Sequence, residues 1–166
     1  MRASRIATAA ILPLVLLAGG SLACARTKYQ PKSFTGGYSE TRLGEDRFRV
    51  SFHGNAYVSR DFVLNGLLYR CAELTRIHGY EHFVIVDAAD DSRAGTYQAP
   101  GTYSGSSTNF GTTTTHQGVY RPGTTVHYTK HGASATIVLR RGVKNPNDPN
   151  AYDAAEVLRY VNPHGG

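Results

Sequence analysis

Hydrophobic and polar positions follow three clear patterns in the middle of the chain. Residues 46–54 alternate between apolar and polar side chains, which predicts a half-buried strand. Residues 59–78 carry apolar side chains at every third or fourth position, which predicts an amphipathic helix with Ser59 as N-cap and Gly79 just after its end. Residues 80–88 contain the apolar run FVIV, which predicts an interior strand. This order is a βαβ-like unit.

The second half of the chain begins with a polar stretch and then becomes periodic again. Residues 90–123 hold six glycines and four consecutive threonines, and this low-complexity composition predicts a long mobile loop. Segments 124–129 and 133–140 alternate and predict a β-hairpin that turns at 130–132, and 152–160 predicts a short helix. The predicted fold is a small two-layer α/β domain of the α+β class, with two helices on a mainly antiparallel sheet of about four strands.

The apolar pattern at the N-terminus is of a different kind. Arg2 and Arg5 precede an almost unbroken apolar run at 6–18, and mostly small residues follow it. This is the layout of an export signal, and the run is shorter than the roughly 20 residues that span a bilayer. We therefore interpret residues 1–23 as a signal peptide, which takes no part in the mature fold.

Two cleavage chemistries fit the end of this segment. The small residues Ser21, Ala23 and Ala25 suit an ordinary signal peptidase. The pair Ala23-Cys24 also resembles a bacterial lipobox, in which the cysteine becomes the lipid-modified first residue, although Leu22 lies one position later than usual. Several acyl chains on Cys24 would form an effectively permanent anchor. Ala25 stands where inner-membrane lipoproteins often carry Asp, which favours the outer membrane.

The rest of the chain divides into a linker and one domain. Residues 24–45 contain few core-forming side chains and are predicted to be a flexible, lipid-anchored tether, followed by a single domain at 46–163. The second cysteine, Cys71, lies on the apolar side of the predicted helix. This position favours a packing role over a reactive thiol or a disulfide with Cys24.

Charge gives a further indication about partners. The formal net charge is +6, and no Asp or Glu occurs between Ser92 and Asn147. Such a surface could bind anionic lipid headgroups or lipopolysaccharide, or it could be an ordinary solvated face. Nucleic acid is a poor partner, because the predicted compartment lies outside the cytoplasm and no recognised binding motif is present.

Residue types that carry chemistry form only weak patterns. The histidine pairs lack the cysteines or the His-Glu-x-x-His pattern of zinc sites, and the aspartates suit either calcium or a solvated loop. The tyrosines within 90–123 suit either stacking on sugars or no specific role. We therefore expect no catalytic residue, metal site or cofactor. The candidates considered are Glu73 with Arg76, His78 with His82, Asp87 with Asp90 and Asp91, and His127 with His131.

Four short motifs resemble an uncharacterised family of short alphaproteobacterial lipoproteins. They are GYSE at 37–40, DRFRVSFxGN at 46–55, LLYRCAELT at 67–75 and GYxxF at 79–83. The resemblance implies lipid attachment at Cys24. It also implies a packing role for the thiol within the third motif, because similar chains usually carry Ala there. It implies no assigned activity.

Taken together, the sequence predicts a bacterial envelope lipoprotein that is anchored through Cys24 and is not an enzyme. Its partners would be the membrane, through the lipid anchor, and an envelope protein or polymer in the periplasm. The alternative is a soluble periplasmic domain that binds a small ligand or a metal.

Overall fold

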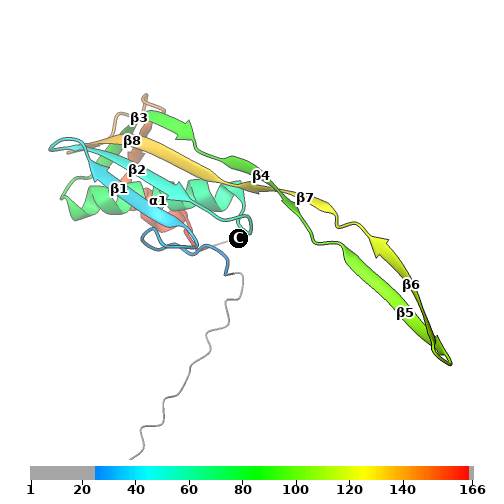
Figure 1. Ribbon diagram of the computed structural model, residues 1–166. Coiled ribbons are helices and arrows are strands. Elements are labelled where there is room, and N and C mark those ends of the chain that lie inside the picture. Colours follow the sequence, from blue (N-terminus) through cyan, green and yellow to red (C-terminus); the bar gives the residue numbers. More distant parts are fainter. Residues whose placement is uncertain (1–24, 165–166) are drawn as a thin grey trace, which may run out of the picture.

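The body of the molecule is an antiparallel sheet with two helices on one face (Figure 1). The computed structural model describes residues 25–164, so the predicted signal peptide 1–23 and Cys24 lie outside the described residues. The five strands follow the order β1-β2-β8-β3-β9, and every neighbouring pair is antiparallel. The α+β class and the mainly antiparallel sheet are confirmed, but the sheet has five strands rather than four. The body elements are β1 Gly37–Arg42, β2 Arg47–His53, α1 Arg60–Ile77, β3 His82–Asp90, β8 Gly132–Arg140, β9 Ala151–Asp153 and α2 Ala154–Tyr160.

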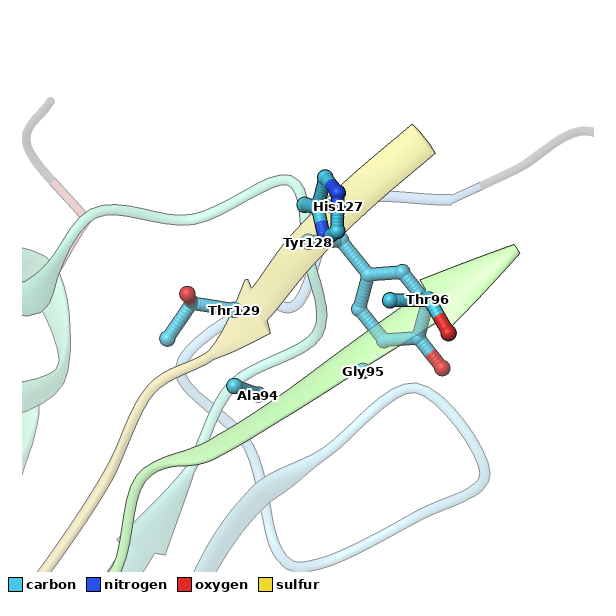
Figure 2. A pocket seen from close by; sticks show the side chains of 6 residues that line it. All are labelled: Ala94, Gly95, Thr96, His127, Tyr128 and Thr129. Carbon is cyan, nitrogen blue, oxygen red and sulfur yellow. The ribbon is translucent and has the colours of Figure 1, made fainter. Parts of the chain in front are cut away.

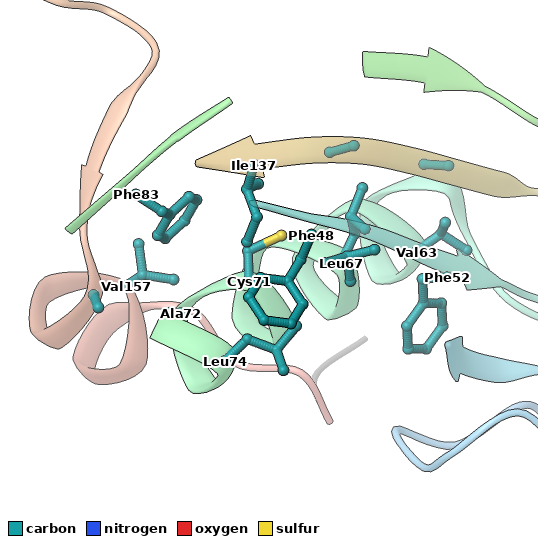
Figure 3. Close-up of a cluster of buried hydrophobic side chains, with 14 of the residues drawn as sticks. Phe48, Phe52, Val63, Leu67, Cys71, Ala72, Leu74, Phe83, Ile137 and Val157 are labelled. Carbon is teal, nitrogen blue, oxygen red and sulfur yellow. The ribbon is translucent and has the colours of Figure 1, made fainter. Parts of the chain in front are cut away.

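The core lies between the sheet and the two helices. Figure 3 shows Phe52, Phe83 and Ile137 from the strands meeting the apolar side chains of α1 and α2. The predicted N-cap of α1 is confirmed, because the Ser59 side chain accepts a hydrogen bond from the Phe62 amide at 3.2 Å. The strands β2 and β3 and the helix α1 lie close to where the hydrophobic pattern predicts them.

A long two-stranded arm extends from the body between β3 and β8 (Figure 1). We define the arm as residues 93–130. Its strands pair β4 with β7 and β5 with β6, both antiparallel. They are β4 Arg93–Gln98, β5 Thr102–Phe110, β6 Thr113–Arg121 and β7 Thr125–Lys130.

The arm replaces the mobile loop that the composition predicts for 90–123. Threonine and tyrosine are strong strand formers, so a low-complexity stretch rich in both can pair with itself without a buried face. Gly111, with a φ of 60°, occupies the first position of the two-residue turn between Phe110 and Thr113. Such turns favour glycine there, because the backbone adopts positive φ.

The prediction of a β-hairpin between residues 124–129 and 133–140 is also wrong. The first of these segments is β7, which pairs with β4, whereas the second is β8, which pairs with β2 and β3. Residues 130–132 therefore join two strands that run onward from the arm into the sheet. A local turn signal does not distinguish a reversal of the chain from a break between two ladders.

The predicted tether at 24–45 is instead largely part of the body. The edge strand β1 lies within it and pairs with β2 over six residue pairs, with Tyr38 opposite Phe52. The sequence GYSETR has few apolar residues, because one face of an edge strand is exposed and only Gly37 is fully buried. The chain before β1 also packs on the body, as described below.

Candidate functional site

The N-terminal segment docks on the body through buried polar contacts. Thr27 is 2% exposed, and its hydroxyl donates to the Thr35 carbonyl and accepts from the Asn55 amide at 2.9 Å. The Asn55 side-chain amide donates to the Ala25 carbonyl at 2.7 Å. The chain is therefore held in place from the first described residue, directly after Cys24. Hydropathy gives no signal for this docking, because hydroxyl and amide groups make it.

Tyr29 adds an aromatic contact to this docked segment. Its ring stacks on Phe52 at 6.2 Å between centroids and meets the edge of Tyr69 at 5.3 Å. Its hydroxyl donates to a carboxylate oxygen of Glu73. Burial, together with that carboxylate, raises the pKa of Tyr29, so the phenol stays protonated. Tyr29 is a packing and hydrogen-bonding residue and not an acid that works near neutral pH.

Arg70 links the docked segment, β1 and α1 through two carboxylates. Its Nε and Nη2 donate to the two oxygens of Glu40 at 3.1 and 2.8 Å, and its Nη1 donates to Glu73 at 2.8 Å. The guanidinium also lies 4.3 Å from the centre of the Tyr38 ring. Burial opposes the charge, but the hydrogen bonds to both carboxylates outweigh it and raise the pKa of Arg70. Sequence spacing predicts Arg76 as the partner of Glu73, whereas the structure places Arg70 there.

Cys71 is a core residue. It is fully buried on α1, as Figure 3 shows, and its thiol is free. Burial raises the pKa of this thiol to about 12, so the reactive thiolate is scarce at neutral pH. The packing interpretation of Cys71 is therefore confirmed.

The histidine pairs are not brought together as ligand pairs. The ring of His78 packs on Phe48 at 4.7 Å, whereas Nδ1 of His82 lies 3.0 Å from the Gly142 carbonyl oxygen. His127 lies on the arm, in β7. Within residues 25–164 no three His, Cys, Asp or Glu side chains are grouped as metal ligands.

Asp90 at the end of β3 and Asp91 directly after it shape the root of the arm. Asp90 accepts a hydrogen bond from the Ser92 amide at 2.9 Å and pairs with Arg60 at 3.4 Å. These hydrogen bonds lower the pKa of Asp90, and those from Ser92 contribute most. The amide of Asp91 donates to the Gly132 carbonyl at 2.9 Å, where the arm joins β8. The solvated loop expected for the three aspartates is therefore wrong for Asp87 and Asp90, which lie within β3, and only Asp91 follows the strand.

The root of the arm and the docked segment share one end of the sheet. His53 at the end of β2 lies opposite Gly132 at the start of β8, and the Gly54 amide donates to the His131 carbonyl at 2.8 Å. Asn55, which holds the docked segment, follows directly. The docked segment, from Ala25 onward, and the root of the arm therefore lie at the same end of the sheet.

Between positions 94 and 120 the arm exposes an uncharged, two-stranded surface. Every residue of β5 and β6 is exposed, and no Asp, Glu, Lys or Arg occurs between positions 94 and 120. Within the described chain, β5 and β6 pair only with each other, so the outer edge of each strand is open. Open strand edges present main-chain N–H and C=O groups that can pair with another strand.

Tyrosine rings cover glycines on the arm. Tyr128 lies directly opposite Gly95, and a Cβ on this glycine would lie 2.6 Å from the ring (Figure 2). Tyr103 also covers Gly118, which lies diagonally across the β5–β6 ladder from it. A hollow of about 450 Å³ lies beside Tyr128, but most of the residues that line it are exposed. It is a feature of an open ribbon and not an enclosed ligand site.

The basic residues of 92–147 do not form one surface. Arg93 and Lys130 face each other across the root of the arm, whereas Arg140 pairs with Asp46 at 2.9 Å at the far end of β8. The cationic face that the sequence suggests is therefore divided between the two ends of the body.

Comparison with protein-family models, with curated proteins and with solved structures found no match to this chain. Among the residues that the structure describes, none of the helices has the length and apolar character needed to cross a membrane.

Proposed function

We propose that the chain is a bacterial envelope lipoprotein, anchored in the outer membrane through an acylated Cys24 and facing the periplasm, with a non-enzymatic binding role. The export-signal layout of residues 1–23 and the resemblance to alphaproteobacterial lipoproteins support the anchor. Ala25 and Thr27 are docked on the body. An acyl group on the preceding residue would hold the folded body next to the membrane.

The arm is the binding element in this proposal, and its open β5–β6 ribbon is the observation that carries it. A lone two-stranded ribbon is at best marginally stable in water, so a further strand on either edge would stabilise it. The ribbon has nine cross-strand pairs, and its one charged residue, Arg121, lies in the pair nearest the body, so little charge opposes a partner strand. An extended segment of another envelope protein that adds a strand to this edge fits these features.

Cell fractionation tests the anchor. Wild-type protein is expected in the membrane fraction, and Cys24→Ser is expected in the soluble periplasmic fraction. A soluble wild-type protein, or a Cys24→Ser protein that stays in the membrane fraction, would contradict the anchor.

Crosslinking in the native envelope tests the arm. Ser106→Lys together with Gln117→Lys places charges on the ribbon, which is how natural proteins prevent strand pairing at an edge. We expect the double variant to lose crosslinked protein partners that wild type retains, and Ser106→Thr is the matched control. Unchanged partners in the double variant, or crosslinking to polysaccharide alone, would contradict strand addition by a protein.

A further inference from the structure

Phe34 is an apolar side chain that the body leaves fully in solvent. Its exposed fraction is 100%, and it lies at the tip of a short turn. Reciprocal backbone hydrogen bonds between Ser33 and Gly36, of 3.0 and 3.1 Å, close this turn. The amide of Lys32 donates to the Tyr38 carbonyl at 2.7 Å and ties the turn to β1. The ring is therefore presented at a fixed place and is not a side chain on a loose end.

The turn lies beside the chain that leads to Cys24. Thr35, next to Phe34, accepts the hydrogen bond from the buried Thr27 hydroxyl. Thr27 lies three positions after Cys24, a span of at most about 11 Å in an extended chain. An acyl group on Cys24 would hold this turn near the bilayer surface.

The charges carried by the chain from Ala25 to Ser39 are of one sign. Residues 25–39 contain Arg26, Lys28 and Lys32 and no Asp or Glu, and all three basic residues are exposed. Basic side chains are attracted to the negative surface potential of a membrane that contains anionic lipid. Aromatic and basic residues together are typical of segments that lie in the headgroup region.

We propose that Phe34, Lys28 and Lys32 form a membrane-contact surface that inserts the Phe34 ring into the interface of a bilayer with anionic lipid. This inference rests on the proposed acylation of Cys24 and adds an orientation to it. The lipid chains hold the protein on the membrane, and the surface fixes which end of the body faces it. The root of the arm lies at this same end of the sheet, so the arm would begin close to the headgroups.

The absence of tryptophan from the chain makes a direct test possible. The variant Phe34→Trp, acylated and purified from membranes, is reconstituted in vesicles of phosphatidylethanolamine and phosphatidylglycerol with brominated acyl chains. We expect its emission to shift to shorter wavelength and to be quenched by bromine. The matched control is Val143→Trp, because Val143 is 96% exposed but follows the far end of β8. We expect its emission to stay that of a solvated indole.

Two results would overturn the membrane-contact surface. One is a Phe34→Trp emission that stays solvent-like and unquenched. The other is a blue shift without quenching by bromine, which means that protein and not lipid covers the ring. The intact mass of the same sample separates this failure from a failure of the proposed function, since it reports acylation of Cys24 directly. Lys28→Gln with Lys32→Gln should reduce the quenching of Phe34→Trp, and unchanged quenching would contradict the role of the two charges.

Discussion

Replacing Thr27 by valine should weaken the docking of the N-terminal segment strongly, although the two side chains have nearly the same size. The hydroxyl lost from this buried residue donates to the Thr35 carbonyl and accepts from the Asn55 amide. Valine fills nearly the same space, so the Thr35 carbonyl and the Asn55 amide lose the Thr27 hydroxyl as a partner while the packing around residue 27 is kept. A hydrogen bond contributes about 1 kcal/mol and an unsatisfied buried group costs about 1–3 kcal/mol. We expect the free energy of unfolding to fall by about 2–4 kcal/mol.

Urea unfolding followed by far-UV circular dichroism measures this loss in a Cys24→Ser background, which is expected to be soluble. Thr27→Ser is the matched control, because it keeps the hydroxyl and loses one methyl group, at a cost of about 1 kcal/mol. Hydrogen exchange at the Asn55 amide should accelerate in Thr27→Val and remain slow in Thr27→Ser. Equal losses of stability in the two variants, with equal exchange, would refute the reasoning that the hydroxyl holds the segment.

Three further predictions concern the body. Gly36→Ala should lower the temperature of thermal unfolding more than Gly79→Ala does. Both positions have positive φ, but of the two only Gly36 would place a Cβ against a backbone oxygen. Equal decreases in the unfolding temperature would contradict this reasoning. Cys71 should react with iodoacetamide at pH 8 only after urea unfolds the protein, because its thiol is buried and has a pKa of about 12. Rapid labelling of the native protein would contradict this prediction. Burial, and then the charge of Lys32, lower the pKa of His53 below its ordinary 6.5. The unfolded chain therefore binds a proton at His53 more readily than the folded protein does, so the free energy of unfolding should fall as the pH decreases below 6.5. His53→Gln should flatten this loss between about pH 7 and 5, and an unchanged slope would contradict it.

The helix and the buried strands could be predicted from the sequence, because each contributes a regular apolar face to the core. The apolar period of α1, its Ser59 cap and Gly79, with a φ of 75°, place the helix to within a residue or two. The alternation of β2 likewise gives the strand and its buried face, with Phe48, Val50 and Phe52 inside.

The arm could not be predicted in this way, because it buries no face. Its ladders are held by main-chain pairing and by tyrosines that lie over glycines, as Tyr128 does over Gly95. Two signals were present: the density of threonine and tyrosine, and the prolines Pro100 and Pro122, which flank β5 and β6. Proline lacks an N–H, so it interrupts a ladder and marks where one pair of strands gives way to the next.

The docked segment was missed for a different reason. Its contacts join residues far apart in the chain, such as Thr27 with Asn55 and Tyr29 with Glu73. Polar partners at such separations leave no periodic trace in a single sequence. The candidate site is therefore assembled by the fold, and only Cys24 could be proposed from the sequence directly.

The intact mass of the mature protein from native membranes tests the central claim most directly. Acylation predicts a chain that begins at Cys24 and carries the added mass of its acyl and diacylglyceryl groups. An unmodified chain that begins at Cys24 or Arg26 as the main species would contradict the lipid anchor.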